Sequence, residues 1–237
     1  MSEHVITEPH NDKYGEKLNK LRAGVLGAND GIVSVAATVV GVASATANSW
    51  PILVAGSAAV IGGALSMALG EYVSVSSQKD SQEALIAKEE LELREMPEAE
   101  LEELIGIYRS RGLSHDTARK VAVELTERNA LLAHLDAELG IDPGDIPSPW
   151  AAAWASAVAC LLGSLLPMLA ILLPPSEWRI PVTFVAVLVA LAITGSLGAR
   201  LGGTPHVGRA AARVVIGGAL ALGATFLIGS LLGVTAA

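Results

Sequence analysis

The sequence is poor in the residues that mark soluble and disulfide-stabilised proteins. Only 17% of its 237 residues are charged, whereas soluble domains carry about a quarter. Cysteine occurs once, as Cys160, so no disulfide can form within the chain. Hydrophobic residues make up 51% of the chain, and its mean hydropathy is +0.50. These values argue against a soluble globular protein and indicate an integral membrane protein.

Motifs of several enzyme classes are also missing. The chain has no GxxxxGK[ST] loop for nucleotide phosphates, no HExxH zinc motif and no GxSxG nucleophile motif. A di-iron oxidase would typically use Glu-x-x-His motifs, and the acidic segment after residue 78 contains none. The sequence therefore predicts neither an enzyme nor a prosthetic group, and bound nucleotide is not expected to supply energy.

Apolar residues gather in long runs instead. A helix needs roughly 20 residues to cross a bilayer. Five runs reach that length, over residues 24–47, 52–74, 151–173, 181–201 and 211–234. The first 20 residues are polar and lack the apolar stretch of a signal peptide. We therefore expect the first run to act as its own insertion signal.

Basic residues near the ends of these runs predict the orientation. They lie before the first run and around the link between the fourth and fifth: Lys13, Lys17, Lys20, Arg22, Arg200, Arg209 and Arg213. The positive-inside rule then places the N-terminus in the cytoplasm and the C-terminus outside. The small-residue usage and the lack of a targeting segment favour a prokaryotic plasma membrane.

An acidic insert separates the second run from the third. Residues 79–148 contain 17 acidic and 8 basic residues, and the rest of the chain is nearly neutral. This charge argues against nucleic acid or anionic lipid as partners and favours cations. The sequence thus divides into a cytoplasmic N-terminal segment (1–22), two spans (23–78), a cytoplasmic metal-binding insert (79–148) and three spans (149–237).

Three helices are expected in the insert. The first continues from the second span, and Pro97 suits the first position of the next helix, which Gly112 ends. Ser114 can cap a third helix over 115–139, which Gly140 ends. This third helix is expected to present one apolar face: Ala118, Val121, Leu125, Leu132 and Leu135. The predicted class is all-α, with five transmembrane helices and a three-helix cytoplasmic insert.

Ionisable residues inside the first two spans point to function. Asp30 lies within the first span in "GANDGIVS", and Glu71 lies near the end of the second. A carboxylate at the centre of a span costs roughly 2.5–3.5 kcal/mol, so it usually marks an ion path. Met67 precedes Glu71 by four residues and shares its helix face. Two carboxylates and a thioether favour a divalent transition metal, although Met67 alone is more often a packing residue and Glu71 can reach water.

Three stretches, "LRAGVLGANDGIVS", "GGALSMALGEYVSVSSQKD" and "GSLGARLGG…RAAARVVIGG", resemble the vacuolar iron transporter (VIT/CCC1-like) family from about Leu21 to the C-terminus. The resemblance implies a homodimer of five-span subunits that exchanges cytosolic ferrous iron, and often manganese, for protons. It also implies that Asp30 and Met67 bind metal within the membrane and that Glu71 assists. Fe2+ or Mn2+ would then be the bound and transported ion.

The same resemblance implies a second metal site in the insert. Its glutamates match Glu89, Glu92, Glu100, Glu103 and Glu138. The spacing alone could not have selected them among the many acids of the insert, since it shows only two i, i+3 pairs. Members of the family carry adjacent methionines before the last glutamate, where this chain has His134 and Leu135. His134 is either a nitrogen ligand or a partly exposed surface histidine.

Two other functions remain open from the residues alone. A metal sensor or membrane scaffold without transport would explain the acidic insert but not Asp30. A membrane ferroxidase would use the glutamates of the insert, although the motifs of such enzymes are missing. Transport accounts for both the insert and the intramembrane carboxylate.

Overall fold

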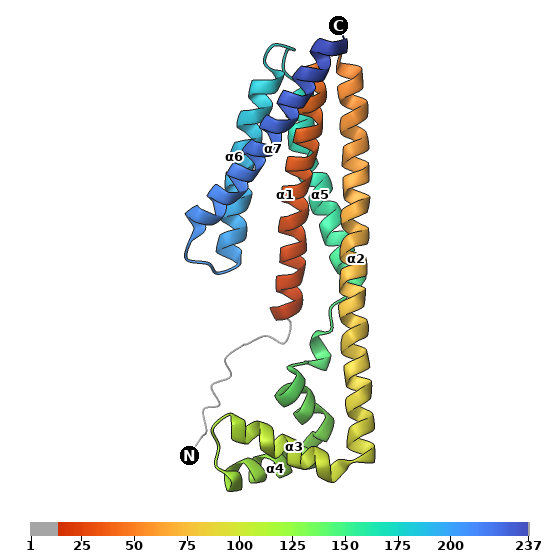
Figure 1. Ribbon diagram of the computed structural model, residues 1–237, viewed down its shortest axis with the longest axis vertical. Coiled ribbons are helices and arrows are strands. Elements are labelled where there is room, and N and C mark those ends of the chain that lie inside the picture. Colours follow the sequence, from red (N-terminus) through yellow and green to blue (C-terminus); the bar gives the residue numbers. More distant parts are fainter. Residues whose placement is uncertain (1–13, 237) are drawn as a thin grey trace, which may run out of the picture. The chain divides into compact units, whose positions relative to one another are not determined.

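The computed structural model describes residues 14–236, which form helices joined by short connections (Figure 1). The α-helices are α1 (Tyr14–Ala45), α2 (Ser49–Glu95), α3 (Pro97–Ser110), α4 (His115–His134), α5 (Pro149–Leu172), α6 (Arg179–Leu201) and α7 (Val207–Ala236). A π-helical turn η1 (Leu135–Leu139) follows α4, and a 3-10 turn η2 (Pro143–Asp145) precedes α5. No strand occurs among the described residues, so the predicted all-α class is confirmed.

Five helical segments are long and apolar enough to cross a membrane. They lie in α1 from Gly27 to Ala45, in α2, in α5, in α6 and in α7 from Val207 to Gly233. The five predicted spans are therefore confirmed, and the chain is a multi-pass membrane protein. Of the predicted N-terminal segment, residues 1–13 lie outside the described residues, and residues 14–22 already belong to α1.

The described chain divides into two compact units. One contains residues 14–16 and 75–148, and the other contains residues 17–74 together with 149–236. The helix α2 contributes to both, since it continues for 47 residues without a break (Figure 1). The four-part division with boundaries after residues 22, 78 and 148 stays a prediction.

The core of the membrane unit is built around α1. Its fully buried valines, Val35, Val39 and Val40, pack with Ile52 of α2 and with apolar residues of α5, α6 and α7. Glycines bring α1 close to its neighbours, because a Cβ atom at Gly233 of α7 would lie 2.8 Å from the Cα of Ala45. Small residues allow such close approach of helices in a membrane.

In the unit that contains residues 75–148, helices begin and end at the proline, glycine and serine residues predicted for these positions. Pro97 starts α3, where a missing backbone N–H costs nothing. After α3, Gly112 adopts a left-handed φ of 98°, and the Ser114 hydroxyl caps α4 by accepting from the Thr117 N–H at 3.3 Å. Gly140, with φ of 61°, ends η1. Residues of α3, α4 and η1 enclose a small apolar core that includes Leu104 and Ile105.

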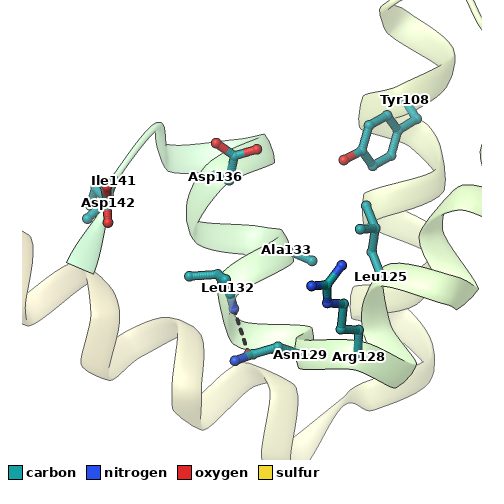
Figure 2. A pocket seen from close by; sticks show the side chains of 9 residues that line it. All are labelled: Tyr108, Leu125, Arg128, Asn129, Leu132, Ala133, Asp136, Ile141 and Asp142. Atoms are coloured by element: carbon teal, nitrogen blue, oxygen red, sulfur yellow. Dashed lines mark hydrogen bonds between the residues drawn. The ribbon is translucent and has the colours of Figure 1, made fainter. Parts of the chain in front are cut away.

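The predicted third helix of the insert extends over the predicted residues, but it is kinked, and the single apolar face predicted for it is wrong at Leu132. The backbone leaves the helical region at Asn129 (φ −168°, ψ 97°), and the Asn129 side chain accepts from the Leu132 N–H at 3.0 Å (Figure 2). Asn129 therefore starts a new turn in the manner of an N-cap, and a π-helical turn follows. The helix face changes across this kink, so Leu132 is 50% exposed whereas Ala118 and Leu135 are buried.

Candidate metal centre

Three helices of the insert bring acidic side chains to one buried histidine. Glu89 lies on α2, Glu100 on α3 and His134 at the end of α4, and all three are buried. The Nδ1 atom of His134 lies 3.0 Å from Oε1 of Glu89 and 3.7 Å from Oε2 of Glu100. Oε2 of Glu138, one turn further along the chain, is 3.8 Å from the same nitrogen. Four side chains thus converge on a single point.

Several of these buried atoms lack a hydrogen-bond partner. Both ring nitrogens of His134 and Oε1 of Glu89 are shielded from solvent and form no hydrogen bond. The 3.0 Å approach between His134 and Glu89 lacks the geometry of one. Buried polar atoms are rarely left unpaired, because desolvation is then uncompensated. A cation held between these donors would satisfy them, so the group fits a metal ion.

Burial and crowding make the carboxyl groups hold protons tightly. Burial, followed by the charges of Glu138 and Glu100, raises the pKa of Glu89 to about 7. Burial and then the charge of Glu103 raise the pKa of Glu100, and the nearby His134 partly opposes this rise. A divalent cation would displace these protons, since its charge favours the ionised carboxylates.

The donor set is one of oxygen and nitrogen. Among the described residues, Glu89, Glu100 and His134 form a group of three histidine or carboxylate ligands whose donor atoms lie within 4.8 Å of one another. Imidazole with carboxylates suits ferrous iron, manganese and zinc, whereas thioether and thiolate sulfur favour softer ions. The histidine is fully buried, so the alternative of a partly exposed surface histidine is wrong.

The other two glutamates of the predicted cytoplasmic site do not reach the His134 ring in this way. Glu92 accepts a hydrogen bond from Lys88 at 2.8 Å on the same helix. Glu103 is exposed, although its charge acts on Glu89 and Glu100. Both therefore lie at the margin of the cluster, and their role as ligands stays a prediction.

The guanidinium group of Arg111, which the sequence did not indicate as functional, supports the turn that carries Glu138. Arg111, just after α3, donates a hydrogen bond to the backbone carbonyl of Ala137 in η1. Its guanidinium also lies over the ring of Tyr108, 5.4 Å from the ring centre. A carbonyl near the end of a helix has no partner within the helix, so this bond fixes the end of η1. No pattern in the sequence links Arg111 with a residue 26 positions away.

A shallow hollow of about 410 Å3 lies beside the kink at Asn129 (Figure 2). Its lining combines apolar residues such as Leu125 and Ile141 with Arg128, Asp136 and Asp142. None of the glutamates near His134 contributes to this hollow. The buried donor group, rather than the hollow, is therefore the candidate metal centre.

The intramembrane residues are arranged differently. Asp30 is exposed on α1, and Met67 and Glu71 are half-buried on α2. Within the described part of the chain, neither Asp30 nor Glu71 belongs to a group of three histidine, cysteine or carboxylate ligands. A metal site containing Asp30, Met67 and Glu71 therefore stays a prediction.

Five spans and a buried donor group in the insert define a multi-pass membrane protein with a candidate metal centre. A family model described as the VIT family matches residues 21–230. The chain belongs to this family, and it is a transporter and not an enzyme.

The sequence similarity to curated relatives extends over most of this chain and most of each relative. The vacuolar iron transporter of Acanthamoeba castellanii is 44% identical over 89% of this chain and 78% of the relative. The vacuolar iron transporter homolog 2 of Arabidopsis thaliana is 35% identical over 93% of the chain and 88% of the relative. The VIT-like transporter 1b of Glycine max is 32% identical over 94% and 80%, respectively.

Proposed function

We propose that this protein is an iron transporter that exports ferrous iron, manganese or both from the cytosol in exchange for protons. The observation that carries the proposal is the buried group of Glu89, Glu100 and His134 in a membrane protein of the VIT family. Iron is supported by the names of the relatives, and the oxygen and nitrogen donors suit both metals. In a plasma membrane with a cytoplasmic N-terminus, this direction of transport is efflux.

The insert gathers the metal from the cytosol. The metal binds between Nδ1 of His134 and the carboxylates of Glu89, Glu100 and Glu138, which already converge on that nitrogen. Glu92 and Glu103 supply further negative charge at the margin and attract cations to it. Binding releases protons, since the free carboxyl groups have raised pKa values.

Within the membrane, Asp30 and Met67 bind the metal, and Glu71 passes metal or protons between the site and the cytoplasmic side. A carboxylate in a span needs a compensating partner. Metal and proton can occupy Asp30 in turn, which couples the two movements in opposite directions. The exposure of Asp30 supports this role, because its side chain remains accessible from outside the subunit.

A homodimer would complete this path. The small residues Gly62, Ser66 and Gly70 on α2 are exposed, and an added Cβ at either glycine would meet no atom within 4 Å. Close helix packing in membranes uses such small-xxx-small stripes. A second subunit against α1 and α2 would cover both this stripe and Asp30, and would place two copies of each donor around one path.

Transport is tested in liposomes that contain the purified protein. Fe2+ or Mn2+ influx is followed with an internal metal-sensitive dye, and proton movement is followed with a pH dye under an imposed pH gradient. We expect metal flux with protons moving the opposite way in the wild type and no flux in Asp30→Ala. Asp116→Ala is the matched control, because it removes an exposed carboxylate at the start of α4.

A metal sensor or scaffold without transport is the second candidate. The observation that favours it is that the three-ligand group lies entirely within the insert. The full-length wild type would then bind Mn2+ but show no flux, and Asp30→Ala would change neither binding nor flux. Metal flux without proton movement would support the proposal that the protein is a transporter and would contradict the exchange of metal for protons.

A further inference from the structure

The first span is held on one side by direct backbone contact with α5. A Cβ atom at Gly27 would lie 2.5 Å from the carbonyl oxygen of Ser156, and one at Gly31 would overlap the carbonyl of Cys160. From the other helix, Gly163 packs against the backbone of Ala28 in the same way. These glycines leave no room for a side chain, so this face of α1 is fixed against α5.

A second face of α1 meets α6. The Thr194 hydroxyl of α6 donates a hydrogen bond of 2.6 Å to Oδ1 of Asn29. One turn earlier on α1, Val25 lies against Gly198 of α6, where an added Cβ would be 3.0 Å from the valine side chain. Asn29 and Val25 thus define a stripe of α1 that faces α6. Of the two contacts, only the hydrogen bond of Asn29 requires a particular orientation of the side chains.

The geometry of the helix then decides where Asp30 points. Successive residues of an α-helix are turned by about 100°, since a turn contains 3.6 residues. Taking Gly27 as the origin, Gly27, Ala28 and Gly31 centre the α5 face near 50°, and Val25 and Asn29 centre the α6 face near 180°. Asp30 falls at about 300°, roughly midway around the remaining arc. Its exposure agrees with this position.

We propose that Asn29 and Thr194 are a positioning pair that sets the rotation of α1 and so aims the Asp30 carboxylate into the metal path. The proposal rests on the proposed transport function. The apolar contact of Val25 with Gly198 has no preferred direction, whereas a hydrogen bond in a medium without competing water does. The pair touches no metal itself, and it acts through the residue next to Asn29.

The pair also explains why an amide lies beside the carboxylate. A side-chain amide inside a span needs a hydrogen-bond partner. Thr194 supplies it, while the other carbonyl near its hydroxyl, that of Leu191, is 3.4 Å away. The Asn29 amide is thereby held against α6 instead of beside Asp30.

The test compares metal dependence of flux in proteoliposomes for Thr194→Val, Thr194→Ser and the wild type. Valine keeps the shape but removes the donor, and serine keeps the hydroxyl. Thr183→Val is the matched control in the same helix, because the Thr183 hydroxyl donates only to the carbonyl of Arg179 in its own helix. Asn29→Ala removes the acceptor and tests the pair from the other side.

We expect Thr194→Val and Asn29→Ala each to raise the KM for Mn2+ by about three- to tenfold, the size of one hydrogen bond between membrane helices. The maximal flux per folded protein should stay within about twofold, and Thr194→Ser and Thr183→Val should behave as the wild type. A purely structural role would instead lower the folded yield and maximal flux at an unchanged KM.

An unchanged KM in both Thr194→Val and Asn29→Ala, with wild-type flux intact, would overturn the positioning role and leave transport standing. A KM increase in Thr183→Val equal to that in Thr194→Val would also overturn it. Absence of flux in the wild type would overturn the proposed function and the positioning role together.

Discussion

The two carboxylate regions of this chain are built in opposite ways. In the insert, Glu89 and Glu100 are buried with His134, and three helices of one chain supply a convergent donor group. In the membrane unit, Asp30 stands exposed on α1, with packing against α5 and α6 on other faces of the same helix. The buried donor group of the insert is formed within a single chain, whereas the proposed path across the membrane uses an exposed face of the subunit and would be completed by a second copy in the proposed dimer.

Among the variants proposed here, Asp30→Asn should give the largest effect, because it should abolish metal flux through the membrane region and leave metal binding to the insert unchanged. The change keeps the shape of the side chain and removes the charge, so metal flux in proteoliposomes should be lost. Mn2+ binding to the insert of the same full-length variant, measured by titration calorimetry, should stay within about twofold of the wild type, as for independent sites. Loss of both flux and insert binding would show that the two regions do not act separately.

His134→Leu should have the converse effect. Removing the nitrogen donor from the buried group is expected to weaken Mn2+ binding to the insert by about ten- to a hundredfold. Flux at saturating metal should persist, because the path contains Asp30. His115→Leu is the control, since this histidine is half-exposed and lies at the start of α4. Equal loss of affinity in both histidine variants would contradict the metal centre.

The pH dependence of stability sharpens the comparison further. The pKa of Glu89 is raised to about 7, so the folded, metal-free chain keeps a proton that the unfolded chain releases near its ordinary value of 4.5. The contribution of this group is therefore neutral below pH 4.5, becomes increasingly destabilising as pH rises from 4.5 towards 7, and levels off above 7 at about 3 kcal/mol. Thermal unfolding of the metal-free protein should show a melting temperature that falls from pH 5 to pH 8.

Glu89→Gln provides the matched comparison. It removes the titrating group, so its melting temperature should fall less over the same pH range. Added Mn2+ should restore the melting temperature of the wild type at pH 8 more than that of the variant. A fall of equal size in both proteins would assign the pH dependence to other groups.

Arg111→Ala should give the smallest effect. The variant loses the hydrogen bond to the Ala137 carbonyl, which fixes the turn that carries Glu138. We expect Mn2+ affinity of the insert to fall by about threefold, and Arg111→Lys to fall less because an ammonium can still donate. Arg109→Ala is the control, since Arg109 is an exposed arginine near the end of the same helix. Wild-type affinity in Arg111→Ala would show that η1 needs no such support.

Much of the fold follows from local patterns. The spans are long apolar runs, and the insert helices begin and end at Pro97, Gly112 and Ser114, where proline, glycine and serine have position-specific effects. The kink at Asn129 could not be predicted in this way. Asparagine is tolerated on an exposed helix surface, and its use as an internal cap depends on the packing of the following turn.

The candidate metal centre was predictable only in part. Spacing alone could not distinguish Glu89 from Glu90, because both lie on a helix whose neighbours in space are set by the tertiary fold. The burial of His134 also depends on packing between α2, α3 and α4. The hydrogen bond between Asn29 and Thr194 could not be predicted for the same reason, because these residues are 165 positions apart and meet only through the tertiary fold.

The lack of a thioether among the convergent donors of the candidate metal centre affects its durability towards oxidants. Ferrous iron and peroxide together generate species that convert thioethers to sulfoxides, and such a change alters the shape and polarity of a methionine side chain. The convergent donors here are carboxylate oxygens and an imidazole nitrogen. The proposed ligands of this centre therefore cannot be altered by conversion of a thioether to a sulfoxide under oxidising conditions.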